Sequence, residues 1–444
     1  MLSKIFKPTS KHPTQAPLLS QDIIQLLLSQ YLDNDLSIAK NLSLTCKSFA
    51  LFCRPYVFRI VVIPSQARSR GILRCSALER FKRFLKRSPF ALSIIQTLRI
   101  TDTHQRIRLY GTRPGASLTE EGESLCYILS QQFTQLRSIE LPSLGGYHHW
   151  SRLPRKAQEA LSSFLNRHPL EYLSITSYYP LDLARLCPTL TRLEFRIHYP
   201  DDVPLGERVP ESVIDATSAL PGDPLHRPPL DLRELSIQDP CSGISTIETA
   251  LTSIIKYESL ETLTYHGNDE PGPALTELVK RANSLTSLRL SVFSGLHRPP
   301  LDLSAHTKLK HLKLKIDLLT TWIGPALRTL LVQGSGSQTL ESLHFFVKTE
   351  RIGSHDDSLF PTGLYFGDAL RHWNQATIRT GRPPPRIQLT FCVRRKACYI
   401  PAPTSMLDPL NTSSNLFLKA MVKSAFRPIA IDVEIAFEDT CTFD

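Results

Sequence analysis

The sequence predicts an α/β fold, in which a three-helix N-terminal unit precedes an irregular repeat solenoid with a parallel sheet. Apolar residues at helical spacing crowd the stretch 17–56, and a Leu-x-x-Leu-x-Leu pattern then recurs nine times. Several copies are separated by stretches with helical periodicity, and strands that alternate with helices form parallel sheets. We therefore divide the chain into 1–16, expected to be a disordered arm, 17–56 and 57–444.

The first expected helix covers residues 22–32. Ser20 is a candidate N-cap, and Asp22 puts a negative charge in the first turn, where the helix dipole favours it. Two neighbouring apolar stripes follow at i, i+4 spacing. They consist of Ile23, Leu27 and Tyr31, and of Ile24 and Leu28.

Two shorter helices are expected next. The turn Asp33-Asn34-Asp35 caps a second helix whose Leu36, Ala39, Leu42 and Leu44 are expected to point inward. A third helix over 47–54 ends before Pro55, and the β-branched stretch 57–63 is expected to be a strand. A unit this small cannot bury much apolar surface by itself, so either the rest of the chain or another protein should cover it.

The order of residues in this unit resembles an F-box. The resemblance rests on Leu19-Ser20-Gln21-Asp22-Ile23-Ile24, Leu27-Leu28, the Asp33-Asn34-Asp35 turn and Leu42-Ser43-Leu44-Thr45-Cys46-Lys47-Ser48-Phe49. The continuation from Cys53 through Pro55 into a strand is similar to fungal F-box proteins with irregular leucine-rich repeats. The sequence departs from the family at Ser20, where Pro is usual, and at Asp22, where Glu is usual.

The resemblance implies that this unit binds the SKP-family adaptor of a cullin-based ubiquitin ligase, while the solenoid presents a target protein for ubiquitination. The implied adaptor-binding residues are Leu19, Asp22, Ile23, Ile24, Leu27, Leu28, Leu44, Cys46 and Phe49. Such a subunit breaks no bond itself and contributes proximity. The alternative is a non-catalytic repeat scaffold whose N-terminal helices only cap the solenoid.

The nine copies of the repeat pattern are expected to be strands. Their apolar positions are Ile95/Leu98/Ile100, Leu136/Ile139/Leu141, Leu170/Leu173/Ile175, Leu190/Leu193/Phe195, Leu232/Leu235/Ile237, Leu260/Leu263/Tyr265, Leu285/Leu288/Leu290, Leu309/Leu312/Leu314 and Leu340/Leu343/Phe345. Their spacing scatters around the roughly 20–29 residues of leucine-rich repeats. The outward positions are mostly small or charged, which predicts a polar concave face suited to protein recognition. They include Glu140, Ser174, Glu194, Ser236, Thr264, Arg289 and Lys313.

Helices are expected before several of these strands. Residues 75–89 form an amphipathic helix with a basic face, and further helices are expected over 120–133, 156–167, 245–257, 274–282, 320–332 and 405–424. Strands near 387–391 and 429–435 would close the sheet. The octapeptide LHRPPLDL occurs at 225–232 and again at 296–303. We interpret it as a duplicated Pro-rich loop.

Charge and cysteine content limit the class of protein. Residues 1–90 hold 15 Lys and Arg against 4 Asp and Glu, and the rest holds 37 of each, so the net charge of +11 lies in the N-terminal quarter. This favours an acidic partner surface over nucleic acid. Nine scattered cysteines without a C-x-x-C favour reduced thiols, and neither a secretory signal nor a membrane-spanning run is evident. We expect a cytoplasmic or nuclear protein that binds no membrane.

The sequence gives no sign of catalysis. It contains no GxxxxGK[ST], GxGxxG, GxSxG or HExxH motif. His148 and His149 are adjacent, which is a poor spacing for metal ligands. We therefore expect a protein that is not an enzyme and that uses no cofactor or metal.

Aromatic and histidine residues gather just after several expected strands. In a parallel solenoid these segments line one rim, and aromatic side chains often anchor interfaces. The residues are Tyr147, His148, His149, Trp150, Tyr178, Tyr179, Tyr199 and His266. They either bind the target protein or cover the edge of the sheet as ordinary loop residues.

Overall fold

A computed structural model describes a large part of the chain. The described residues are 26, 28, 29, 32, 35–65, 77–102, 122–141, 150, 153–177, 179–197, 228–239, 251–267, 273–292, 301–317, 339–349, 386–393 and 433–439. The expected arm 1–16 and the expected helices over 320–332 and 405–424 lie outside them. Among the described helices, none is long and apolar enough to cross a membrane.

In the described part of the chain, twelve strands form one parallel sheet in chain order. They are β1 (Ile60–Ser65), β2 (Thr97–Asp102), β3 (Ser138–Glu140), β4 (Tyr172–Thr176), β5 (Arg192–Arg196), β6 (Glu234–Asp239), β7 (Thr262–Gly267), β8 (Ser287–Val292), β9 (His311–Asp317), β10 (Ser342–Thr349), β11 (Arg386–Val393) and β12 (Val433–Asp439). All nine expected repeat strands are confirmed, as β2 to β10. The parallel α/β architecture follows from this order.

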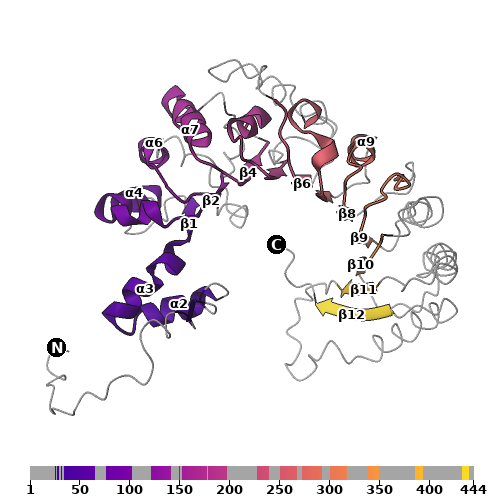
Figure 1. The fold of residues 1–444 in the computed structure, drawn as a ribbon, viewed down its shortest axis with the longest axis horizontal. Helices are drawn as coiled ribbons and strands as arrows, with labels where there is room; N and C mark the ends of the chain where they lie inside the picture. Colours follow the sequence, from indigo (N-terminus) through magenta and orange to yellow (C-terminus); the bar gives the residue numbers. More distant parts are fainter. Residues whose placement is uncertain are drawn as a thin grey trace, which may run out of the picture.

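The sheet bends into an arc with the strands on its inner side (Figure 1). Helices α4 (Ala77–Arg87), α6 (Gly122–Ser130), α7 (Arg155–Arg167) and α9 (Pro273–Arg281) lie on the outer side. The 3-10 helices η1 (Pro89–Ser93), η5 (Leu181–Leu186) and η9 (Tyr257–Ser259) lie between strands in the chain. The four α-helices confirm those expected over 75–89, 120–133, 156–167 and 274–282. The helix expected over 245–257 ends earlier, because Ile255 pairs with Leu230 in an isolated bridge.

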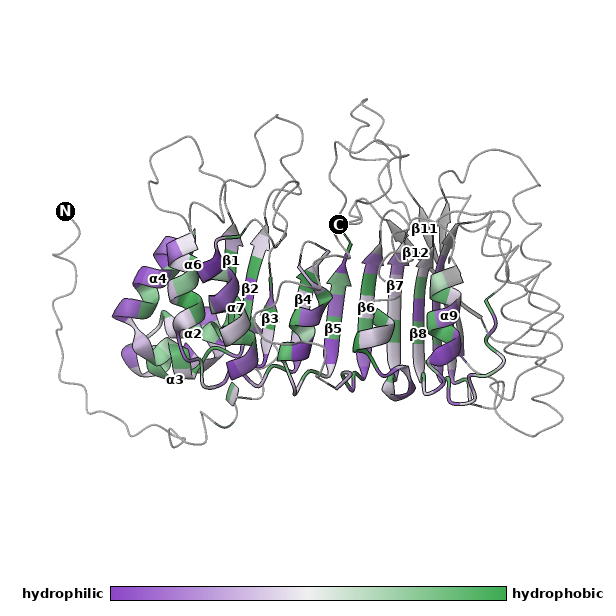
Figure 2. Cartoon of the chain, turned by 90° about the horizontal axis from the view of Figure 1, so that it is seen from above, coloured by the Kyte–Doolittle hydropathy of each residue, from purple (hydrophilic) through white to green (hydrophobic). Residues whose placement is uncertain are grey.

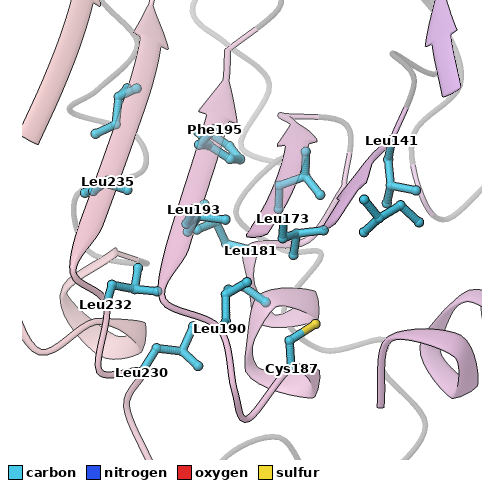
Figure 3. Packing of buried hydrophobic residues seen from close by; sticks show 14 of the residues in the cluster. Leu141, Leu173, Leu181, Cys187, Leu190, Leu193, Phe195, Leu230, Leu232 and Leu235 are labelled. Atoms are coloured by element: carbon cyan, nitrogen blue, oxygen red, sulfur yellow. The ribbon is translucent and has the colours of Figure 1, made fainter. Parts of the chain in front are cut away.

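The middle apolar residues of the nine repeats form one row across the sheet. Neighbouring strands pair them in sequence, from Leu98 with Ile139 to Leu312 with Leu343. All nine are buried in one core under the outer helices, part of which Figure 3 shows. A slip of one residue would turn this row onto the inner face, so burial fixes the register. Figure 2 shows hydrophilic residues interspersed with these hydrophobic ones along the strands.

The duplicated octapeptide contributes to the core. Leu230 and Leu232 are buried in the first copy, and Leu301 and Leu303 are buried in the second. A third Pro-Leu-Asp-Leu, at 180–183, also buries its two leucines. The described residues of both copies of the octapeptide lie outside the helices and strands, as expected of a loop, and their buried leucines fill the core on the approach to a strand.

The helical unit lies at the β1 end of the arc (Figure 1). It contains the described helical residues between 26 and 32, α2 (Leu36–Ser43) and α3 (Lys47–Phe58). The expected cap of the second helix is confirmed: the carboxylate of Asp35 accepts a hydrogen bond from the Ser37 backbone N–H at 2.8 Å. This bond satisfies one of the orphan donors at the helix start.

The third helix is longer than expected. It continues through Pro55 to Phe58, so the strand begins at Ile60 instead of residue 57. Tyr56 and Val57 pack against the buried residues of the helical unit, and this burial holds the last turn. Pro55 removes the hydrogen bond to the Leu51 carbonyl, but both residues are on the exposed side of the helix, where water can take its place.

Candidate functional site

The helical unit has a small core of its own. Leu32, Ala39 and Cys53 are buried there, and this cluster is separate from the large core under the sheet. The partly buried residues packed around it are Leu28, Ile38, Leu42, Phe52, Tyr56 and Val57. The unit therefore buries part of its apolar surface within itself rather than against the repeats.

Four other leucines of the unit face solvent. The exposed fractions are 67% for Leu26, 39% for Leu36, 84% for Leu44 and 51% for Leu51. Soluble proteins expose single apolar residues freely, but several large ones on so small a unit are typical of an interaction surface. We call these four residues the apolar surface of the helical unit.

The residues expected to bind an adaptor fall into three groups. Leu44 and Cys46 are exposed and Phe49 is half-buried, so these three are accessible. Leu28 packs against the small core. Leu19, Asp22, Ile23, Ile24 and Leu27 lie outside the described residues.

Sequence reasoning missed parts of this surface. Leu36 and Leu44 were expected to point inward and are exposed, which corrects those predictions. The expected inward positions Ala39 and Leu42 are confirmed, and Ile38 also packs against the small core. Leu26 and Leu51 were not among the candidates. Both leucines could have been recognised in the sequence, because they lie outside the apolar stripes whose members, such as Leu28 and Cys53, form the small core.

An aromatic joint connects the unit to the first repeat. The ring of Phe58 stacks on Phe84 of α4 with a centroid distance of 5.3 Å and meets Phe90 edge-on at 6.1 Å. The Arg54 guanidinium lies 5.1 Å from the centroid of the Phe90 ring. Aromatic and cation–π contacts of this kind contribute about 0.5–1.5 kcal/mol each, so the joint fixes the unit at the end of α3.

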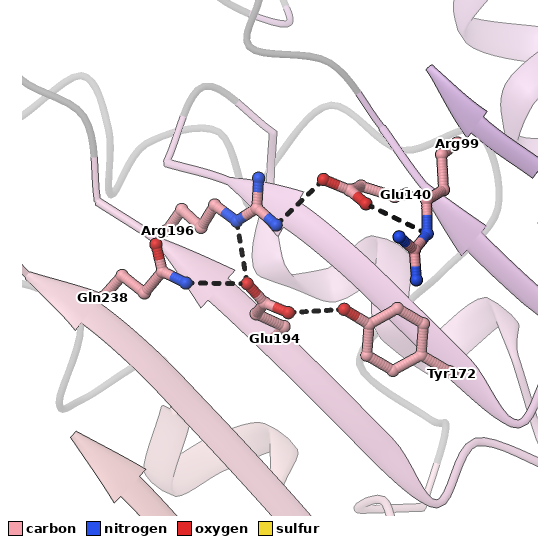
Figure 4. Close-up of polar contacts among 6 residues, drawn as sticks. All are labelled: Arg99, Glu140, Tyr172, Glu194, Arg196 and Gln238. Atoms are coloured by element: carbon pink, nitrogen blue, oxygen red, sulfur yellow. Dashed lines mark hydrogen bonds and ion pairs between the residues drawn. The ribbon is translucent and has the colours of Figure 1, made fainter. Parts of the chain in front are cut away.

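The inner face carries a polar network over β2 to β6 (Figure 4). The Arg196 guanidinium contacts Glu194 at 2.8 Å and Glu140 at 2.9 Å, and Arg99 lies 3.7 Å from Glu140. Glu194 also accepts hydrogen bonds from the Tyr172 hydroxyl and, at 2.9 Å, from the Gln238 amide. Each carboxylate in the network therefore faces a guanidinium.

The charged groups in this network stabilise one another. Burial opposes the charge of Arg196, but Glu194 and Glu140 outweigh it and raise the pKa of the guanidinium. Burial and the neighbouring Glu194 raise the pKa of Tyr172. An open hollow of about 420 Å³ lies over the same strands, with Arg99, Tyr172, Glu194 and Glu234 among its lining residues. It is polar and shallow, which suits the surface of a macromolecule.

The inner face over β8 to β10 has a different character. Arg289 and Lys313 are exposed, and Lys315 and Phe346 are half-buried. The Lys313 ammonium lies 4.3 Å from the centroid of the Phe346 ring. Burial and, to a smaller extent, Lys313 lower the pKa of His344 to about 4, so that this imidazole is neutral at physiological pH. We call Arg289, Lys313, Lys315 and Phe346 the cationic patch.

Two residues expected to bind a target are in the core. Trp150 and Tyr179 are buried, and their ring centroids lie 6.2 Å apart. Their assignment to a binding rim was wrong, because large aromatic side chains at strand ends can fold back over the core. His266 is exposed on the inner face, in register with Ser291. Tyr147, His148, His149, Tyr178 and Tyr199 lie outside the described residues.

No family model matches the chain, and no curated protein matches it significantly. Within the described ranges, no group of three His, Cys, Asp or Glu side chains is placed to hold a metal ion.

Proposed function

We propose that the chain is the substrate-recognition subunit of an SCF-type cullin ubiquitin ligase. The helical unit binds an SKP-family adaptor, and through it a cullin. The repeats, which are leucine-rich-repeat-like, hold a target protein. The proposal rests on the resemblance of residues 19–49 to an F-box. It is supported by one structural observation, the apolar surface on a unit that already has its own core.

That observation favours an adaptor over the alternative role as a cap. A cap buries its apolar side chains in the end of the repeat core. Here the buried residues of the unit form a separate cluster, and the aromatic joint around Phe58 connects the unit to the first repeat without joining the two cores. Leu44, the most exposed of the large apolar residues described, is left for a partner.

The apolar surface can supply part of the free energy of a complex. At 1.5–3 kcal/mol for each side chain, burying four leucines is worth at most about 6–12 kcal/mol, and less here because Leu36 and Leu51 are already partly buried. Association costs about 4–15 kcal/mol, so polar contacts and shape complementarity must supply the rest. The exposed Lys40 and Lys47 of the unit would provide such contacts for an acidic adaptor surface.

The sheet supports the second half of the proposal. Its inner face carries polar and charged side chains along the described strands, among them Arg99, Glu140, Glu194 and Arg289, which suit contact with a protein surface. The chain then acts by bringing a target near the ligase, which raises the effective concentration of the reacting groups.

Co-purification tests the proposal. The full chain is co-expressed with an SKP-family adaptor, and Leu44→Glu is compared with Val62→Glu, which changes an exposed apolar residue on β1 outside the helical unit. We expect the adaptor to co-purify with the wild type and with Val62→Glu and to be lost from Leu44→Glu. An adaptor that never binds the wild type refutes the proposal.

A further inference from the structure

Helix α4 gathers positive charge on the outer side of the first repeat, at the end of the arc nearest the helical unit (Figure 1). It holds one acid, Glu79, against five cations, which are Arg80, Lys82, Arg83, Lys86 and Arg87. The other described α-helices on the outer side hold fewer. Helix α6 has no Lys or Arg, and α7 and α9 each hold one acid against three and two cations. The charge of α4 therefore exceeds that of its counterparts.

Three of these cations form a stripe along the exposed side of α4. Arg80, Arg83 and Arg87 are spaced i, i+3 and i+7, which places them on one face of the helix. A rise of 1.5 Å per residue spreads them over about 10 Å. All three side chains are exposed, whereas Leu78 and Leu85 on the opposite face are buried in the large core. The stripe can therefore be approached from solvent.

The acid of α4 neutralises only part of this charge. The Glu79 carboxylate lies 3.3 Å from the Lys82 ammonium and 3.1 Å from Nε of Arg83. Arg80 and Arg87, by contrast, are exposed and form no ion pair with a described residue. The positive charge at the two ends of the stripe is therefore available to an anion from another molecule.

An aromatic surface borders the stripe. Phe84 follows Arg80 by four residues, so the two side chains are neighbours on the helix. Its ring stacks on Phe58, which meets Phe90 edge-on. Phe90 is exposed, and the Arg54 guanidinium lies 5.1 Å from the centroid of its ring. The aromatic joint therefore connects the stripe to an exposed ring that has a cation of its own.

We propose that α4 and the joint bind an acidic peptide segment of a partner protein, with carboxylates on Arg80 and Arg87 and an apolar side chain on Phe90. Arginine donates charge-assisted and often bidentate hydrogen bonds to carboxylates. Alternate side chains of an extended peptide are about 6.7 Å apart, so two or three acidic residues span the stripe. This site lies outside α2 and α3 except at the joint, so its occupancy does not depend on the proposed function.

The structure favours a peptide over a membrane surface or a nucleic acid. A helix that binds a membrane inserts its apolar face into the lipid, but Leu78 and Leu85 of that face are in the core. A nucleic acid needs cations along an extended track of phosphates. Toward the second repeat the track ends, because α6 offers Glu123 and no cation, and Lys86 lies over the Tyr127 ring.

Fluorescence anisotropy with the full-length protein tests the proposal. The probe is a labelled synthetic peptide of alternating Glu and Leu, and two reference probes have Gln in place of Glu or Ser in place of Leu. Arg80→Glu/Arg87→Glu is compared with Lys156→Glu/Lys280→Glu. The control makes the same change of charge at exposed lysines in the first turn of α7 and the last turn of α9, as Arg80 and Arg87 lie in the first and last turns of α4.

We expect Arg80→Glu/Arg87→Glu to weaken binding of the acidic probe at least about tenfold and the control to leave it within about twofold. The Gln probe should bind the wild type at least about tenfold more weakly than the acidic probe, because it lacks the carboxylates. The Ser probe should bind at least about threefold more weakly, because it cannot pack an apolar side chain on Phe90.

Other results overturn the proposal. These are failure of the wild type to bind the acidic probe, equal binding of the acidic probe and either reference probe, or an equal loss in both variants. Tighter binding of a poly-dT oligonucleotide, or of vesicles that contain phosphatidylserine, through the same two arginines would also overturn it. If the reversal variant loses its native melting transition, Arg80→Gln/Arg87→Gln gives the same readout without introducing carboxylates.

Discussion

Arg289 and Lys313 are paired in register on the parallel strands β8 and β9, with both side chains exposed on the inner face of the sheet. At the other end of the same face, Arg99 occupies the equivalent position of β2 and is paired with a carboxylate, Glu140. The sheet can therefore accommodate an opposite-charge pair at this position. Two cations in register repel each other, so a change in the sign of the charge at position 289 should alter the stability of the sheet.

Arg289→Glu is predicted to stabilise the protein. The new carboxylate would face Lys313, and a change from repulsion to attraction at this position is worth about 0.2–1 kcal/mol. Urea unfolding measures the free energy of unfolding. A decrease in stability would show that Arg289 supports the fold instead.

The same substitution at the equivalent position of β2, Arg99→Glu, is the matched control. Arg99→Glu puts a carboxylate beside Glu140 and should lower the free energy of unfolding by about 0.2–1 kcal/mol. The two variants make the same substitution, so their opposite signs would isolate the effect of the neighbour.

Glu194→Ala is predicted to destabilise the protein by about 1–3 kcal/mol, because it removes the acceptor of the Tyr172 hydroxyl, Arg196 and the Gln238 amide together. Chemical denaturation measures the loss. The control is Glu171→Ala, which removes an exposed carboxylate 3.8 Å from Arg137 and should change stability by less than about 0.5 kcal/mol. Equal effects would mean that the network is dispensable.

The buried His168 is expected to make the folded protein less stable at acidic pH. Its Nε2 accepts a hydrogen bond from the Phe133 backbone N–H at 3.1 Å, and its Nδ1–H donates to the Phe164 carbonyl at 2.8 Å. Burial, and to a smaller extent Arg167, lowers the pKa of this imidazole below its ordinary value of 6.5. As the pH falls, the unfolded state therefore takes up the proton at a higher pH than the folded state does. The contribution of the neutral imidazole to the free energy of unfolding is complete above pH 6.5 and is lost as the pH falls below it.

His168→Gln tests the pH dependence, since an amide can donate and accept at both positions without titrating. We expect it to cost about 1 kcal/mol at neutral pH and to flatten the decline of stability between neutral and acidic pH. Urea titrations across that range measure it. A residual slope is expected from His306, whose pKa burial also lowers. An unchanged slope would exclude His168 as a source.

Much of the fold could be predicted because the Leu-x-x-Leu-x-Leu pattern reports burial directly. Residues such as Leu193 and Leu312 point into the core under the outer helices. Their need for burial also sets the register of the strands. The boundary between helix and strand at Pro55 could not be predicted in the same way. It depends on the packing of Tyr56 and Val57 against residues distant in the chain, which outweighs the local preference of proline.

The candidate sites were harder to predict for a related reason. An aromatic residue after a strand, such as Trp150 or Tyr179, has the same composition signal whether it covers the core or faces a partner. The Arg289 and Lys313 pair is easier to recognise in the sequence, since each residue directly follows the middle leucine of its repeat. Aligning the repeats on that leucine places the two cations side by side, but only the sheet order shows that they are neighbours.

Deleting residues 1–55 separates an adaptor-binding unit from a cap. This removes Leu32, Ala39 and Cys53 but keeps Phe58 at its joint with Phe84 and Phe90. We expect the remainder to stay soluble and to keep its cooperative melting transition, because the large core contains none of the deleted residues. Aggregation or loss of the transition would favour the alternative role as a cap.

The most direct test of the central claim is calorimetry with the purified full-length protein and an SKP-family adaptor that binds a known F-box protein. The claim predicts saturable one-to-one binding, and Leu44→Glu should weaken it about tenfold or more, because losing one buried leucine costs about 1.5–3 kcal/mol. Val62→Glu should bind as the wild type does. Heats of dilution alone for the wild type, with the adaptor active toward the known protein, would contradict the claim.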